Sequence, residues 1–195
     1  MKKLFLVFAV SAKSLFCSAE DNDRISVAAG GGAGYMVNSL DIYGNLIDTK
    51  VYGHGFAEMG FRSDKTDDYY SWAFNRPTGS LGFSFLGTGA IQCKPGSSLG
   101  HLYTLYGCFQ TDVLRTSCFA FGPYLDWGLT YTDKKYDASA NPGNLYVGSN
   151  IIMLFGAGLE FRFHTDGHFE PGLRLGYAHR SNGMLKVPNF GLNMF

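Results

Sequence analysis

The stretch FAFGPYLDWGLTY, residues 119–131, alternates large apolar side chains with small or polar ones. The large apolar side chains are those of Phe119, Phe121, Leu125, Trp127, Leu129 and Tyr131. The opposite face carries Ala120, Gly122, Tyr124, Asp126, Gly128 and Thr130. Successive side chains of a strand point to opposite faces, so this period of two predicts a β-strand. The small face suits the inside of a narrow barrel, where bulky side chains would not fit, and the large face is then expected to meet lipid.

Residues 155–163 and 172–181 repeat the pattern, with aromatic and aliphatic side chains on one face and glycine, alanine and a few charges on the other. Glu160, Arg162 and Arg174 fall on the small face, and we expect them to pair across neighbouring strands inside the barrel. A soluble lipocalin-like barrel, which places its apolar face inside, is the structural alternative.

The composition points the same way. The 195 residues suggest one domain, and 16 basic and 16 acidic residues give a net charge of zero, which argues against a nucleic-acid partner. Only 16% of residues are charged, whereas 26 are Gly, 17 are Phe and 12 are Tyr. Such a chain, without an apolar run long enough for a transmembrane helix, favours an all-β, antiparallel transmembrane barrel.

Eight strands are expected, at about 24–36, 50–62, 81–90, 100–110, 114–131, 149–164, 168–181 and 189–195. Long polar connections (37–49, 91–99 and 132–148) alternate with short turns (111–113 and 165–167), as in outer-membrane barrels. Residues 63–80 depart from this rule, and Trp72 to Pro77 are expected to form a small plug or turn element. The last strand is short for a membrane-spanning strand, which needs about 9–11 residues, and is either stunted or truncated.

The first residues indicate an export signal. Lys2 and Lys3 precede a short apolar stretch, Leu4 to Val10, and Cys17-Ser18-Ala19 is an acceptable small-residue cleavage site. We therefore expect residues 1–19 to be a signal peptide and residues 20–195 to form the barrel domain in the outer membrane. A structural N-terminal helix is the alternative.

Without the signal, three cysteines remain: Cys93, Cys108 and Cys118. An odd number allows at most one disulfide within the chain, and their pairing is left open. Because no CxxC occurs, a cysteine-based zinc site is not expected.

His179 and Ser181 are two residues apart on a predicted strand and therefore share a face. A serine hydroxyl is a weak nucleophile at neutral pH unless a base such as an imidazole activates it. The pair is thus a candidate nucleophile and base, although His-x-Ser alone is a weak signal.

The surrounding segment HRSNGMLKVPNFGLN, residues 179–193, resembles the motif of the lipid A 3-O-deacylase family, also called acyloxyacyl hydrolase-like proteins. That motif runs His-x-Ser-Asn, a short Gly-containing stretch, Pro-Asn-x-Gly, and an acid or amide two residues further on. The resemblance implies an eight-stranded outer-membrane barrel. It also implies a serine esterase that removes an ester-linked acyl chain from lipid A, the membrane anchor of lipopolysaccharide, with no cofactor and no metal.

By this resemblance Ser181 is the nucleophile, His179 the general base and Asn193 the third member of the triad. Asn182 and Asn189 are candidates for binding the oxyanion or orienting the site. Characterised deacylases have a glutamate where this chain has Asn193. An amide oxygen can accept the imidazole N–H and hold its tautomer, but it supplies no charge to an imidazolium.

Three other patterns have simpler structural interpretations. Residues 96–100, GSSLG, fit the nucleophile-elbow formula but lack the helix that must follow, so a Gly/Ser loop is expected. Residues 164–168, HTDGH, could suggest a metal, but Asp-Gly between two strands predicts a hairpin turn first. His54 and Glu58 share a strand face and are interpreted as lumen or loop residues.

The rival function is a non-catalytic barrel, either a lipid-binding or a structural outer-membrane protein with a degraded site. Asn193 and the short last strand favour it modestly. The residues leave open which acyl chain would be cut and whether the protein forms a homodimer.

Overall fold

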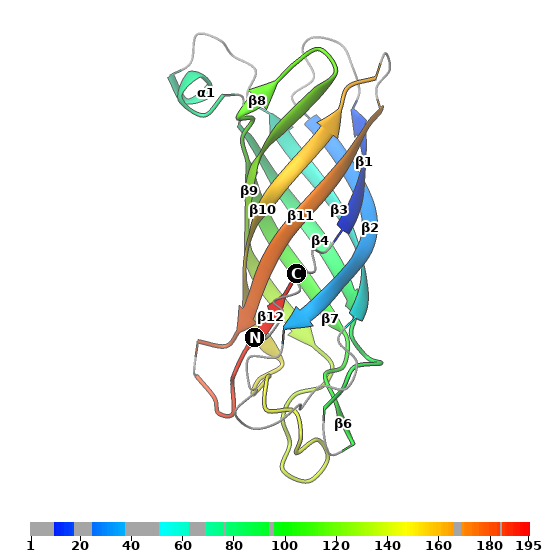
Figure 1. The fold of residues 1–195 in the computed structure, drawn as a ribbon. Helices are drawn as coiled ribbons and strands as arrows, with labels where there is room; N and C mark the ends of the chain where they lie inside the picture. The colour runs from blue at the N-terminus through cyan, green and yellow to red at the C-terminus, as the bar shows by residue number, and fades with distance from the viewer. Residues whose placement is uncertain are drawn as a thin grey trace, which may run out of the picture.

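The computed structural model describes residues 10–17, 25–37, 51–62, 69–75, 77–93, 96–165, 169–183 and 185–195. Eight antiparallel strands close into a ring, each paired with its neighbour in chain order (Figure 1). They are β2 (Ile25–Val37), β3 (Val51–Arg62), β4 (Thr78–Gly87), β7 (Leu102–Gln110), β9 (Phe119–Thr132), β10 (Ile151–Phe163), β11 (Phe169–Ser181) and β12 (Leu192–Met194). The predicted antiparallel barrel of eight strands is confirmed. Among the described residues, no helix is long and apolar enough to span a membrane.

The barrel wall has the predicted sidedness. Large apolar side chains point outward and are exposed; among them are Leu105, Leu125, Trp127, Leu129, Phe155 and Phe163. The alternate positions point into the lumen, where Glu160 and Arg162 are buried. This arrangement is opposite to that of the lipocalin-like alternative, which is therefore wrong.

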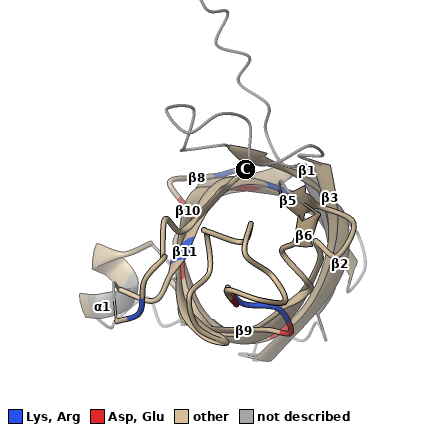
Figure 2. Ribbon diagram, turned by 90° about the horizontal axis from the view of Figure 1, so that it is seen from below, with Lys and Arg blue, Asp and Glu red and all other residues tan. Residues whose placement is uncertain are grey.

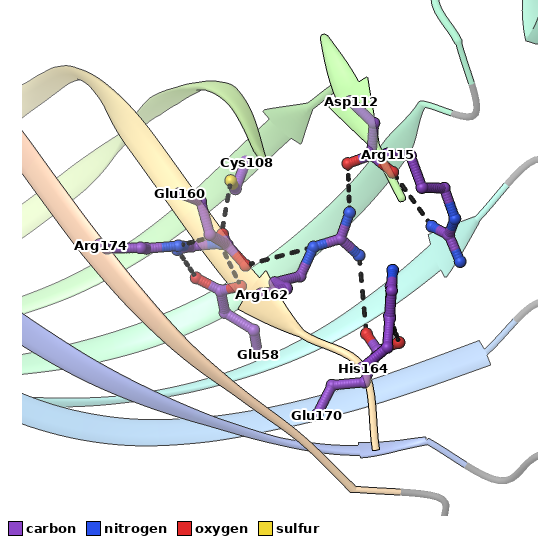
Figure 3. A network of polar contacts seen from close by, with 9 residues as sticks. All are labelled: Glu58, Cys108, Asp112, Arg115, Glu160, Arg162, His164, Glu170 and Arg174. Atoms are coloured by element: carbon purple, nitrogen blue, oxygen red, sulfur yellow. Dashed lines mark hydrogen bonds and ion pairs between the residues drawn. The ribbon is translucent and has the colours of Figure 1, made fainter. Parts of the chain in front are cut away.

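A network of ion pairs lies inside the lumen (Figure 3). Arg174 Nη1 lies 2.5 Å from Glu58 Oε1, and Arg174 Nε lies 2.6 Å from Glu160 Oε2. Tyr106 donates its hydroxyl hydrogen to Glu58 at 2.7 Å. Arg162 pairs with Asp112 and extends the network toward one end of the barrel. The predicted pairing of Glu160, Arg162 and Arg174 inside the barrel is confirmed.

Long loops close the opposite end. Their buried side chains pack against inward-facing side chains at the ends of the strands and form one apolar core. Figure 2, which is viewed from this end, shows loop segments lying across the ring. The core contains Met36, Tyr52, Leu86, Ile91, Cys93, Leu99, Leu102, Tyr146, Val147, Ile152, Leu192 and Met194. The loops are therefore anchored inside the wall, and Leu192 and Met194 of β12 belong to the same core.

Two predicted strand boundaries are wrong because turns intervene. The strand expected at 81–90 ends at Gly87, since Ile91 N–H donates to the Thr88 carbonyl and closes a turn. The strand expected at 114–131 is split into β8 (Leu114–Arg115) and β9. Between these strands, the Thr116 hydroxyl accepts hydrogen bonds from the Cys118 and Phe119 N–H groups, which is a typical side-chain-stabilised turn.

The segment between β3 and β4 contains a short helix, α1 (Tyr69–Ala73), at the end of the barrel opposite the long loops (Figure 1). Trp72 in this helix is 73% exposed. The helix therefore lies outside the lumen. Of the plug and the turn element that were predicted for this segment, the turn element is right and the plug is wrong.

The eighth position of the ring is shared by two chain segments. β12 has three residues and is shorter than the predicted strand 189–195. It pairs with residues 178–180 of β11 and 36–37 of β2. Further along the same two strands, β1 (Val10–Cys17) pairs with residues 169–174 of β11 and 26–33 of β2. β1 lies within the predicted signal peptide, whose cleavage stays a prediction. Cleavage after Ala19 would remove β1 and leave these edges of β11 and β2 without that partner.

Candidate functional site

His179 and Ser181 lie at the end of β11, beside the long loops and on the outer face of the wall, where both are half-buried. The backbone register places Phe155 of β10 opposite His179 and Met153 opposite Ser181. On the other side of β11, Asn193 of β12 lies opposite His179. The pairing of β11 with β12 therefore gathers the predicted triad residues at one outward-facing place.

A hydrogen bond of 2.9 Å joins His179 Nδ1 to Asn193 Oδ1. An amide oxygen only accepts hydrogen bonds, so the imidazole must carry its proton on Nδ1. In the neutral ring Nε2 is then unprotonated and can take a proton from a hydroxyl. The contact thus holds the tautomer that a general base needs.

The serine is placed beside this base but is not yet bonded to it. Within the described part of the chain, no hydrogen bond joins the Ser181 hydroxyl to His179. Alternate residues of a strand share a face, so Ser181 and His179 are neighbours on the outer face, and we expect them to bond when substrate is present. Catalytic hydrogen bonds of this kind are often long without substrate and shorten when substrate binds.

The other two predicted site residues, Asn182 and Asn189, shape the loop that follows β11. Asn182 N–H donates to Asn189 Oδ1 at 3.3 Å, and Asn182 Nδ2 donates to the Lys186 carbonyl at 3.0 Å. The Asn182 side chain is buried. These hydrogen bonds support the predicted orienting role of both side chains. A direct contact of either amide with an oxyanion stays a prediction.

Gly191 lies directly against the imidazole. Its φ of 72° is in the left-handed region, and a Cβ atom built there would lie 2.7 Å from His179 Cε1. Gly191 N–H donates to the Tyr146 carbonyl at 3.1 Å, and Tyr146 belongs to the buried loop core. The loop core therefore fixes the position of Gly191. Because Gly191 has no side chain, the imidazole of His179 fits beside it.

We expect Gly191→Ala to lower the rate of ester hydrolysis by about 100-fold, because the added methyl group would displace the imidazole, and small misplacements cost about that much. The measurement is the hydrolysis rate of the refolded variant in detergent micelles. Gly96→Ala is the matched control, since Gly96 has the same φ of 72° but no atom within 4 Å of its built Cβ. Equal losses in both variants would mean that backbone strain, and not displacement of His179, is responsible.

One residue of this site was missed as a candidate from the sequence. Tyr177 shares the outer face of β11 with His179, and its hydroxyl donates a hydrogen bond to Asn193 Oδ1. The sequence does place Tyr177 two residues before His179, which puts both on one face of the strand. Aromatic residues recur at many outward positions, however, and nothing in the pattern distinguishes Tyr177 from them.

An apolar surface borders the site. Trp127 and Leu129 of β9 lie opposite Phe155 and Met153 of β10, and all four side chains are exposed on the outer face. Exposed apolar patches of this kind mark contacts with lipid, ligand or protein. An acyl chain lying along these strands would reach Ser181.

Within the described residues, the GSSLG segment and the His54/Glu58 pair form no second site. Ser97 and Ser98 of the GSSLG segment form the short strand β6, which pairs with β5 (Gln92–Cys93), and the Ser97 hydroxyl accepts the Gly143 N–H at 2.8 Å. No helix follows this loop within the described chain, so the elbow formula does not apply. His54 and Glu58 face the lumen, as predicted. The described residues include no group of three or more His, Cys, Asp or Glu suited to a metal, and Asp166 to His168 lie outside them.

Among the three cysteines of the expected barrel domain, Cys93 and Cys108 are buried and Cys118 is exposed. No disulfide forms among these three residues.

Fold and site together define a narrow, polar-filled β-barrel with an apolar outer wall and a Ser–His–Asn cluster on its outer face. Comparison of the chain with family models, curated proteins and solved structures gives no match. The function is therefore argued from the wall and the cluster themselves.

Proposed function

We propose that this chain is an outer-membrane serine esterase that removes an ester-linked acyl chain from lipid A, at the 3-O position, or from a related acylated glycolipid. The observation that carries the proposal is the meeting of His179, Ser181 and Asn193 on the outward face, with the His179–Asn193 hydrogen bond in place. The resemblance of residues 179–193 to the lipid A deacylase motif names the substrate class.

The outer wall supports a membrane location. Its exposed side chains are aliphatic and aromatic around the ring, while the charges are collected in the lumen. In water, such a wall would be a large apolar surface without a partner, whereas in a bilayer it would be solvated by lipid. With the short turns on the periplasmic side, the long-loop end and the site lie at the outer leaflet, where lipid A resides.

The proposed reaction uses these side chains in the following order. His179 Nε2 takes the proton of the Ser181 hydroxyl as its oxygen attacks the ester carbonyl carbon. The sugar hydroxyl leaves with the proton returned by His179, and the acyl group remains on Ser181. A water molecule, activated by the same imidazole, releases the fatty acid and restores the serine.

The test is the release of fatty acid from lipid A in detergent micelles by the refolded protein. Release that survives a strong metal chelator is expected, because the proposed chemistry uses only side chains. No release from lipid A or related glycolipids, at any pH at which the barrel is folded, would favour the rival non-catalytic, lipid-binding or structural barrel. The amide at Asn193 is the observation that favours this rival.

Asn193→Glu is expected to raise the hydrolysis rate, because a carboxylate would stabilise the imidazolium that forms in the transition state. Loss of the triad carboxylate can cost about 10⁴-fold, but that figure includes a wrong tautomer, which Asn193 already prevents. The gain should therefore be well below this value. The measurement is the rate of both proteins between pH 6 and pH 9, with folding checked by heat-modifiability on a gel.

An unchanged or lower rate in a folded Glu variant would mean that Asn193 does not stand in for the acid. Glutamate is one methylene longer than asparagine, so Asn193→Asp is the companion variant that adds the charge without the length.

A further inference from the structure

We propose that Tyr177 is a positioning residue. Its hydroxyl holds the Asn193 amide with the oxygen toward His179 and so fixes the tautomer of the imidazole. The consequence for catalysis rests on the proposed function, whereas the effect on the tautomer does not.

The contacts place three groups around one oxygen atom. Asn193 Oδ1 accepts a hydrogen bond from the Tyr177 hydroxyl and is 2.9 Å from His179 Nδ1. Tyr177 and His179 are two residues apart on β11 and reach this oxygen from the same face. The Phe195 ring lies against the Tyr177 ring, with centroids 5.0 Å apart, which supports the position of the phenol.

An asparagine in this place has a weakness that a carboxylate lacks. The oxygen and the nitrogen of an amide have nearly the same shape, so a half-turn about the last side-chain bond exchanges them. With the NH₂ group toward His179, Nδ1 would accept a hydrogen bond and the ring proton would move to Nε2. An Nε2–H imidazole cannot take the serine proton.

Tyr177 opposes this half-turn because a phenol donates hydrogen bonds more readily than it accepts them, since its oxygen lone pair is delocalised into the ring. The phenol hydrogen therefore favours the orientation in which the amide oxygen faces both Tyr177 and His179. When an amide replaces the carboxylate, control of the imidazole tautomer and the negative charge are both weakened or lost, and Tyr177 compensates for one of these two properties. It compensates for the tautomer and not for the charge.

The experiment reads the tautomer directly. The protein contains five histidines, and nitrogen NMR of ¹⁵N-histidine-labelled protein in micelles distinguishes Nδ1–H from Nε2–H rings, with a His179→Gln sample assigning the signal. We expect the Nδ1–H form in the unmodified protein and a shift toward the Nε2–H form in Tyr177→Phe. Tyr131→Phe, which removes a hydroxyl from another exposed tyrosine of the outer face, should change nothing.

A second variant guards against a local packing effect of the first. Tyr177→Leu removes the hydroxyl together with the ring and should shift the tautomer in the same direction. An unchanged Nδ1–H signal in either variant, with the barrel folded on a gel, overturns the proposal even if no hydrolysis can be measured. If only the hydrolysis fails, the proposed esterase function is contradicted, whereas the tautomer measurement and its conclusion about Tyr177 are unaffected.

Where hydrolysis is measured, a double-mutant cycle adds a second readout. Tyr177→Phe should lower kcat about tenfold in the Asn193 protein, the size of one lost hydrogen bond. In the Asn193→Glu background the same change should have little effect, because both oxygens of a carboxylate accept. Equal losses in the two backgrounds would assign Tyr177 a merely structural role.

Discussion

Ser181→Ala is expected to reduce the hydrolysis of the acyl ester by about 10⁶-fold, the size of the loss when the nucleophile of a serine hydrolase is removed. The reason is that in the proposed mechanism the Ser181 oxygen carries the acyl group. The measurement is fatty-acid release from lipid A in micelles, together with covalent labelling by a lipid-like serine-reactive probe. Labelling should disappear with the activity.

Ser117→Ala is the control, because Ser117 is an exposed serine in the turn between β8 and β9, at the opposite end of the barrel. It should retain full activity and labelling. His179→Ala should be nearly as damaging as Ser181→Ala, and the double variant no worse than either, since the members of a catalytic unit are not additive. Full activity in a folded Ser181→Ala protein would show that the nucleophile is another residue.

Arg174→Met should lower the free energy of unfolding by about 3–5 kcal/mol, the usual cost of removing one partner of a buried ion pair. Arg174 contacts two carboxylates, those of Glu58 and Glu160, and its side chain is only 7% exposed. Its guanidinium also lies over the Tyr124 ring, 4.8 Å from the ring centroid. The variant would leave two buried carboxylates without their shared cation.

The measurement is urea unfolding in detergent micelles, followed by the gel shift between folded and unfolded barrel. Arg115→Met is the control, because Arg115 is 28% exposed and its buried partner Asp112 keeps its ion pair with Arg162, so a loss of only about 0–1 kcal/mol is expected. Adding Glu58→Gln and Glu160→Gln to Arg174→Met should recover much of the stability. A loss in Arg174→Met no larger than in Arg115→Met would mean that the network fills the lumen without stabilising it.

The sequence alone determined the barrel and the sides of its wall. Alternation along 119–131, 155–163 and 172–181 depends only on strand geometry, in which each side chain faces opposite to the next. It therefore predicted which residues face outward and that Glu160, Arg162 and Arg174 face inward. The same local geometry placed His179 and Ser181 on one face, and the predicted limits of β10 and β11 were right to within two residues.

Turns escaped the prediction because they depend on hydrogen bonds of individual side chains and not on a period. Hydrogen bonds to the Thr116 hydroxyl stabilise a turn between the end of β8 and the start of β9, although the apolar pattern of the sequence continues across this turn. The position of β1 escaped it as well, since its apolar residues match an export signal and the β11–β2 gap is visible only in the closed ring.

Only the tertiary structure decided which residues meet across strands. Glu58 and Arg174 are 116 positions apart and become partners because closure of the ring brings β3 and β11 to face each other across the lumen. Asn193 meets His179 and Tyr177 through the pairing of β11 with β12, and Gly191 meets the imidazole through a loop anchored on Tyr146. Periodicity assigns each side chain to a face, but the register between strands is set by closure of the whole ring, and the contacts of this site depend on that register.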